Sequence, residues 1–198
     1  MARKESVSKE LINQTAFEML REEGKENITA RRLAARIGCS TQPIFRVYEG
    51  MDELYATLFG MAMKYFDTYY AKYVKEHSTP FVDLGLAYID FAQTESNLFK
   101  VLFLSKDRFD KELYELLNGE SGAVKDEIMK AAKNGCKAPS SLFMKMWIFI
   151  HGAACMSITG DYDLPKNETV NLLKAYFTSE EGALKRIATS PIITDGLL

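Results

Sequence analysis

The sequence contains few of the residues that build catalytic or metal sites, with only three cysteines and two histidines among 198 residues. Cys39, Cys136 and Cys155 lack the short spacing that holds a metal, and their odd number suits free thiols in a reducing cytosol. His77 and His151 lie far apart, and no carboxylate pair stands near either of them. We therefore expect no metal ion and no cofactor, and we do not expect an enzyme.

The chain also lacks the marks of fibrous, secreted and membrane proteins. Five prolines and twelve glycines are too few for a low-complexity chain. The N-terminal sequence MARKESVSKE has no apolar core, which excludes a signal peptide and favours a cytoplasmic location. The apolar stretch of residues 142–158 is interrupted by Lys145 and His151 and is shorter than the roughly 18–20 residues that span a bilayer. We expect a buried helix there and no membrane association.

Charge of neither sign dominates, since the formal net charge is −2. Residues 1–50 contain nine basic and seven acidic side chains, a net charge of +2. Residues 51–198 contain 16 basic and 20 acidic side chains, a net charge of −4. A nucleic-acid contact, if there is one, is therefore expected at the N-terminal end.

Helical periodicity runs through almost the whole chain. Between Ile12 and Leu20 the apolar residues follow i, i+4, i+7, i+8 spacing, with Ser6 or Ser8 as a cap and Gly24 as the end of the first helix. No alternating strand pattern and no internal repeat occur. The sequence predicts an all-α protein with a three-helix N-terminal domain, residues 1–50, and a C-terminal helical bundle, residues 51–198. Helices of the bundle are expected at 51–77, 81–94, 96–104, 109–118, 121–134 and 139–160, and from about 167 into the 180s.

Residues 37–50, IGCSTQPIFRVYEG, predict a tight turn between two short helices. Gly38 ends a helix that begins after Thr29, and Ser40 is placed to cap the next one. Pro43 would then be the third helical residue, where its missing N–H breaks no helical bond, so Ser40 would accept from the N–H of Gln42. Two short helices joined in this way predict a helix-turn-helix.

The second of these helices carries side chains suited to reading bases. In a helix-turn-helix the N-terminal residues of the recognition helix meet base edges in the major groove. Gln42 can pair bidentately with adenine, and Pro43 suits a thymine methyl group. Thr41 is also free to reach a base, and Arg31, Arg32 and Arg36 of the preceding helix are expected to face outward.

The segment ITARRLAARIGCSTQPIFRVYEGMDEL, residues 28–54, resembles the DNA-binding signature of the TetR/AcrR family of transcriptional repressors. The resemblance covers about residues 6–58, and WIFIHGAA, residues 147–154, resembles the dimer-forming helix of many members. Three positions where members commonly contact phosphate carry Phe45, Val47 and Met51 here. The matching residues are Thr29, Leu33, Ala34, Gly38, Ser40, Ile44, Phe45, Tyr48, Glu53 and Leu54.

The resemblance implies a homodimer that binds a pseudo-palindromic double-stranded DNA operator and is released by a small ligand held in the C-terminal helices. By position, Arg31, Thr41, Gln42 and Pro43 would address bases or the groove floor, and Thr29, Ser40, Phe45 and Arg46 would lie near the backbone. The full set of expected DNA-binding residues is Thr29, Arg31, Arg32, Ser40, Thr41, Gln42, Pro43, Phe45, Arg46 and Tyr48.

Aromatic residues are abundant in the C-terminal part, where a ligand pocket or a simple helical core would account for them. The small residues at 152–154 would let two helices approach closely in a dimer. The expected ligand is an unidentified small apolar molecule. Its candidate contacts are Phe66, Tyr70, Tyr88, Phe91, Phe103, Trp147 and His151, and the candidate interface residues are Phe149, Gly152, Ala153 and Met156.

The leading interpretation is therefore a ligand-responsive DNA-binding regulator, most simply a repressor. One alternative is an all-α enzyme or binding protein for an apolar molecule, which the absence of an acid–base or nucleophile arrangement disfavours. Another is an adaptor that uses the helix-turn-helix for protein contacts or non-specific DNA binding.

Overall fold

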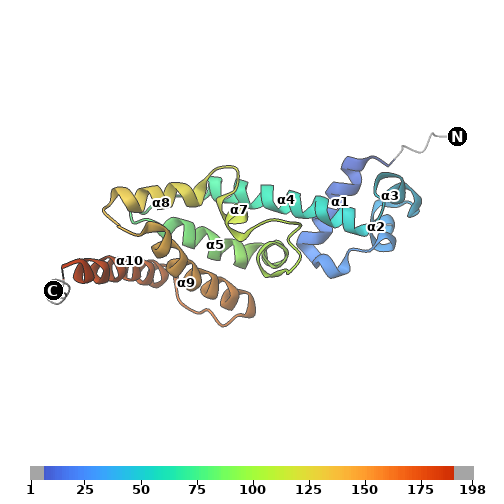
Figure 1. Cartoon of the computed structure of the whole chain (residues 1–198). Helices are drawn as coiled ribbons and strands as arrows, with labels where there is room; N and C mark the ends of the chain where they lie inside the picture. The colour runs from blue at the N-terminus through green and yellow to red at the C-terminus, as the bar shows by residue number, and fades with distance from the viewer. Residues whose placement is uncertain (1–6, 190–198) are drawn as a thin grey trace. The chain divides into compact units, whose positions relative to one another are not determined.

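The computed structural model describes residues 7–189, with side chains up to residue 179. This part of the chain is helical and contains no strand, which confirms the predicted all-α class (Figure 1). A 3₁₀ turn lies at Lys25–Asn27 and a π-helical turn at Lys100–Leu104. The helices are α1 (Lys9–Glu23), α2 (Ala30–Ile37), α3 (Gln42–Val47), α4 (Met51–Lys72), α5 (Val82–Thr94), α6 (Ser96–Phe99), α7 (Leu113–Asn118), α8 (Ala123–Lys133), α9 (Pro139–Thr159) and α10 (Lys166–Thr189).

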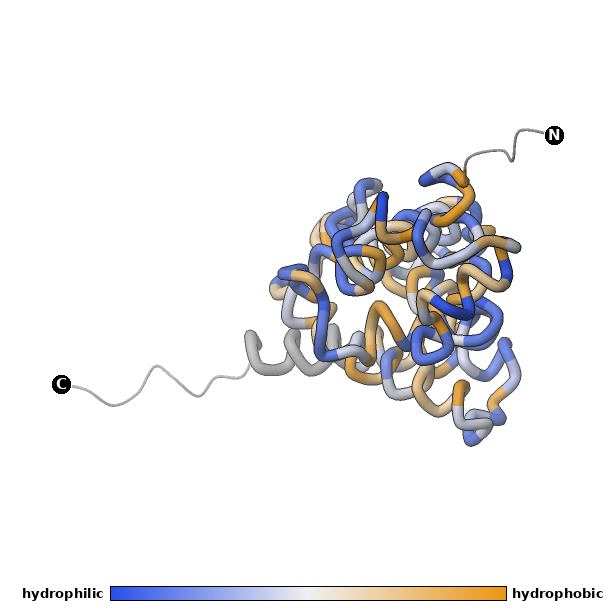
Figure 2. The backbone as a smooth tube through the Cα atoms, turned by 90° about the vertical axis from the view of Figure 1, so that its right-hand side faces the viewer, coloured by the Kyte–Doolittle hydropathy of each residue, from blue (hydrophilic) through white to orange (hydrophobic). Residues whose placement is uncertain are grey.

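The chain forms two compact units that do not coincide with the predicted boundary at residue 50. The first takes in the chain up to Lys72 together with Phe91–Ser121, and the second takes in Tyr73–Asp90 and the chain from Gly122 onward. Hydrophobic and hydrophilic segments alternate along much of the chain (Figure 2). Most helices therefore bury one side, whereas α5 is buried on all sides from Val82 to Ile89.

In the first unit, α1 packs against α2, α4 and α6. The hydroxyl of Ser8 accepts the N–H of Leu11 at 3.1 Å, and Gly24, with φ of 86°, ends the helix, so both predicted limits of α1 are confirmed. Ile12 of α1 is completely buried, as are Leu33 of α2 and Ile44 of α3. The three N-terminal helices are thus anchored in one core.

In the second unit, α9 packs against α8 and α10. By length and composition α9 could cross a membrane, since its mean hydropathy reaches 1.4. One side of it is nevertheless buried, including Met146 and Ile150. A Cβ atom on Gly85 of α5 would lie 2.8 Å from Cδ1 of Ile150, so a side chain there would require the end of the Ile150 side chain to shift. The expected absence of membrane association stays a prediction.

The long fourth helix ends earlier than predicted, at Lys72 rather than residue 77. The N–H of His77 donates to Oδ2 of Asp83 at 2.9 Å, and Nδ1 of the same histidine lies 2.6 Å from Oδ1. Asp83 belongs to the first turn of α5. The polar groups of His77 therefore serve the start of the next helix instead of extending α4.

Candidate nucleic-acid interface

The turn between α2 and α3 is built by backbone bonds in a conformation that favours glycine at position 38. The hydroxyl of Thr29 accepts the N–H of Arg32 at 3.2 Å and caps α2, as predicted. Gly38 adopts the left-handed conformation, with φ of 80° and ψ of 33°, and the N–H of Cys39 then returns to the carbonyl of Ala34 at 2.9 Å. A side chain at position 38 would strain this conformation, so glycine fixes the sharp exit from α2.

The predicted cap at Ser40 is wrong, because α3 begins later. Its first helical residue is Gln42, and Thr41 stands at the N-cap without a side-chain cap bond. The carbonyl of Thr41 accepts from the N–H of Ile44 at 3.1 Å and of Phe45 at 3.3 Å. Pro43 is therefore the second helical residue rather than the third, and its missing N–H still costs no helical bond.

Helix α3 presents one polar and aromatic face to solvent. Ile44 is fully buried, whereas Gln42 and Arg46 are exposed and Phe45 has 51% of its surface accessible. Thr41 and Pro43 are half-buried at the start of the helix, and Ser40 and Thr29 are exposed. The exposed face of α3 thus carries Gln42, Phe45 and Arg46, while Ile44 holds the helix to the core.

Tyr48, which was predicted to contact DNA, lies in the core instead. Only 1% of its surface is accessible, and its hydroxyl donates to Oδ1 of Asn13 in α1. The ammonium group of Lys9 lies 5.2 Å from the centre of the ring. Tyr48 therefore fixes the end of α3 to α1 and offers DNA no side-chain surface.

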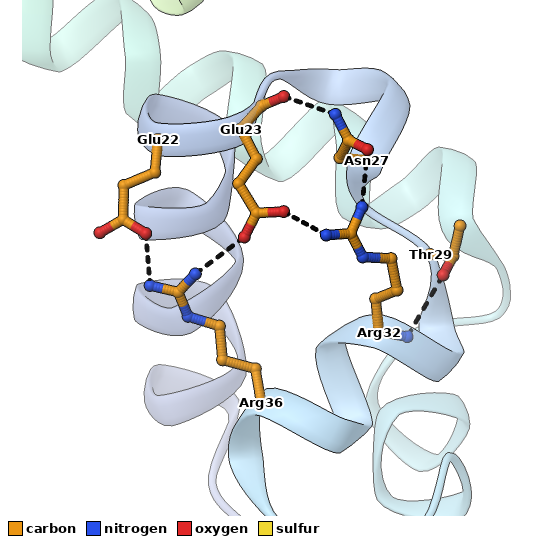
Figure 3. A network of polar contacts seen from close by, with 6 residues as sticks. All are labelled: Glu22, Glu23, Asn27, Thr29, Arg32 and Arg36. Atoms are coloured by element: carbon orange, nitrogen blue, oxygen red, sulfur yellow. Dashed lines mark hydrogen bonds and ion pairs between the residues drawn. The ribbon is translucent and has the colours of Figure 1, made fainter.

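Two of the three outward arginines of α2 are held by acidic residues at the end of α1 (Figure 3). Arg32 forms an ion pair with Glu23 and donates to Oδ1 of Asn27 at 2.6 Å. Arg36 reaches Oε1 of Glu23 at 2.9 Å and Oε2 of Glu22 at 2.6 Å. We name these five residues the arginine clamp.

The clamp changes the electrostatics of the expected DNA surface. The carboxylate of Glu22, hydrogen-bonded to Arg36, raises the pKa of that guanidinium, which stays charged in any case. Among the ion pairs of residues 7–179, none involves Arg31 or Arg46. These two arginines are thus the free cations of α2 and α3, whereas Arg32 is already engaged.

The clamp could not be found from the sequence. Glu22 and Glu23 precede Arg32 and Arg36 by 9 to 14 positions, which matches no helical spacing. Their contact depends on the angle between two helices, which periodicity does not give.

The seven residues predicted to line a ligand pocket are divided between the two units, and all are buried or half-buried. In the first unit, the ring of Phe66 lies edge-on at 4.9 Å from that of Phe91 and at 5.2 Å from that of Phe103, and Tyr70 is also buried. These rings contact one another as the side chains of a helical core do. For these four residues the structure favours the core role.

The other three form a cluster in the second unit. The rings of Tyr88 and Trp147 are 4.5 Å apart, and the hydroxyl of Tyr88 lies 3.0 Å from Nδ1 of His151. His151 also stacks on Trp147 at 5.5 Å. This histidine is held by its neighbours, and a core role is again favoured.

The predicted dimer residues fall on both sides of α9. Gly152 and Met156 are exposed, Phe149 is half-buried with its ring 6.5 Å from that of Tyr176 in α10, and Ala153 is only 4% accessible. The position of Ala153 is therefore corrected from interface to core.

Two exposed apolar residues of α9 were missed, although their spacing signals them. Met144 and Ile148 precede Gly152 and Met156 at intervals of four residues, and 68% of the surface of Ile148 is accessible. Residues four apart lie on one face of a helix, so these four form a single exposed stripe, the α9 stripe.

Comparison of the sequence with protein-family models and with curated proteins finds no match.

Proposed function

We propose that this protein is a DNA-binding transcriptional regulator of the kind that the TetR/AcrR resemblance implies, acting as a homodimer and responding to a small molecule. In this proposal α2, the turn at Gly38 and α3 form the helix-turn-helix, and α3 enters the major groove. The simplest consequence of operator binding is repression of transcription.

The observation that carries the proposal is the arrangement of α3. Its inner side chain, Ile44, and the following Tyr48 are buried, while Gln42, Phe45 and Arg46 are exposed side by side on a short helix. Gln42 supplies a bidentate donor and acceptor for adenine, and Arg46 supplies a charge for phosphate. This combination suits a helix that reads base edges and is positioned by contacts with the DNA phosphate backbone.

A binding selection from a random duplex library tests the proposal. We expect one recovered sequence with two related half-sites, since a two-fold protein dimer binds a pseudo-palindrome. An adaptor that meets DNA non-specifically would recover no common sequence, and a protein without DNA function would retain no duplex at 50 mM salt.

The substitution Gln42→Ala should lower affinity for the selected operator by about 1–3 kcal/mol and relax preference at one base pair. Arg31→Ala is the control, since an arginine that meets only phosphate should weaken operator and random duplex alike. Gel-shift titration of both duplexes measures the effect. Equal losses on the two duplexes for Gln42→Ala would exclude its role as a base reader.

The substitution Met51→Lys should tighten binding to operator and random duplex by similar factors. Met51 is half-buried and is the first residue of α4, where the resemblance places a phosphate contact. One new phosphate contact steepens the salt dependence by about 0.9 units per subunit. Met129→Lys adds the same charge to an exposed methionine of α8 and serves as the control. A slope as steep for the control as for Met51→Lys would show that position 51 does not face the DNA backbone.

A further inference from the structure

A groove with an apolar floor lies between α1 and α4, apart from the residues predicted to bind a ligand. It has a volume of about 540 Å³, within the roughly 300–1,000 Å³ of small-molecule sites. Phe17 of α1 and Met61, Tyr65 and Tyr69 of α4 form its apolar and aromatic lining. All four belong to the first compact unit.

One wall of the groove is fixed by a polar network. Nε of Arg21 donates to Oε2 of Glu95 at 3.0 Å, and the hydroxyl of Tyr65 donates to Oε1 of the same carboxylate at 2.7 Å. Nδ2 of Asn97 also donates to the carbonyl of Arg21 at 2.9 Å. The Arg21 side of the groove is thus set before any ligand enters, which lowers the entropic cost of binding.

The charged side chains that line the groove have a positive balance, with Arg21, Lys64 and Lys72 against Glu18. Lys64 and Lys72 line it from α4, two helical turns apart, and both are exposed. In the part of the chain whose side chains are described, neither has an ion-pair partner. The one acidic residue of the lining, Glu18, accepts a hydrogen bond from Nε2 of Gln14 at 2.8 Å and keeps its negative charge, so the two lysines still outnumber it.

We propose that this groove binds an apolar molecule that carries one carboxylate. The apolar body lies on Phe17, Met61, Tyr65 and Tyr69, and the carboxylate pairs with Lys64 or Lys72. A molecule with a positive end is disfavoured by both lysines.

Occupancy of the groove by a ligand is expected to change DNA binding, and this part rests on the proposed function. Helix α1 forms one side of the groove and carries Glu22 and Glu23, which hold α2 through the arginine clamp. A molecule that enters between α1 and α4 acts on the helix that positions α2 and α3. By linkage, its occupancy changes operator affinity by a factor of about 5 to 150.

Calorimetric titration with decanoate, and with decan-1-ol as its uncharged counterpart, tests the site itself. We expect one decanoate per chain and weaker binding of the alcohol. The double variant Lys64→Gln, Lys72→Gln should bind decanoate about 2- to 30-fold more weakly, as expected for two exposed charges, with no change for the alcohol. Lys106→Gln, which removes an exposed lysine outside the groove, is the matched control.

A second variant, Thr68→Trp, fills the groove from α4 and should abolish decanoate binding. Among the residues whose side chains are described, the hydroxyl of Thr68 bonds only to the carbonyl of Lys64 in its own helix, so its loss leaves α4 intact. Absence of binding to the wild type, equal affinity of the double variant and Lys106→Gln, or undiminished binding to Thr68→Trp would each overturn the proposed site.

Operator affinity with and without decanoate tests the coupling. A change in the wild type that disappears in Thr68→Trp supports it. Decanoate that binds by calorimetry without changing operator affinity overturns the coupling and leaves the site. A chain that binds no operator at all contradicts the proposed function, while the calorimetry still decides the groove.

Discussion

The variant Glu23→Gln is expected to bind every DNA duplex more tightly than the wild type, with the largest gain at low salt. The carboxylate of Glu23 pairs with both Arg32 and Arg36, and a neutral amide removes both ion pairs. The freed guanidinium of Arg32 can then neutralise a phosphate and add about 0.9 units to the salt dependence, whereas Arg36 keeps its ion pair with Glu22. We therefore expect a slope steeper by about one unit per subunit, measured from affinities at several salt concentrations.

The specificity ratio between operator and random duplex should change little, because phosphate contacts position a protein without reading sequence. Exposed ion pairs contribute little to stability, so the variant should remain folded, as circular dichroism can verify. Glu26→Gln is the matched control, since it removes the same charge three residues on, from an exposed side chain without an ion pair in the described residues. An equal gain for both variants would mean that overall charge, and not the clamp, limits binding.

The variant Gly152→Leu is expected to convert the proposed dimer into a monomer. The α9 stripe exposes Met144, Ile148 and Met156 around this glycine, and such contiguous apolar surface is typical of an interface. In a two-fold dimer the same stripe meets its own copy, so one bulky side chain blocks the approach twice. The measurement is the mass by light scattering at micromolar concentration, which should fall from twice the chain's 22.4 kDa to that value.

The substitution should leave the fold of each chain intact, because a Cβ atom at position 152 meets nothing within 4 Å. Gly60→Leu is a close control, since Gly60 is also an exposed helical glycine with open space around it, on α4. A dimer binds both half-sites of an operator at once, whereas a monomer binds only one. Gly152→Leu should therefore also lose most of its operator affinity. A wild type that is already monomeric, or a variant that stays dimeric, would remove the α9 stripe from the proposed interface.

The helices themselves were predictable because each depends on residues close in sequence. Ser8, Thr29, Gly24 and Gly38 stand where caps and stops were expected, and each acts through backbone groups within a turn or two. The start of α3 was misplaced because the chain leaving Gly38 does not re-enter a helix at once. Ser40 has a good capping side chain, but the first helical bonds are accepted by Thr41.

The candidate site was only partly predictable, because exposure depends on packing between helices. Gln42 and Arg46 are exposed as expected, whereas Tyr48 turned inward to Asn13, which is 35 residues earlier. The aromatic residues expected around a ligand fill space against one another. Apolar composition predicts burial well, but it cannot distinguish a filled core from a cavity.

The first compact unit is built from two separate stretches of the chain, so its N-terminal helices cannot be moved to another protein on their own. Helix α1 packs against α6, and Phe66 of α4 packs against Phe91 and Phe103, all within that unit. A graft of residues 1–50 onto another protein would leave the contacts with α4 and α6 behind and expose the side chains that they cover. A chimera that changes which DNA is read should therefore exchange exposed side chains of α3, such as Gln42 and Arg46, and keep the rest of the unit whole.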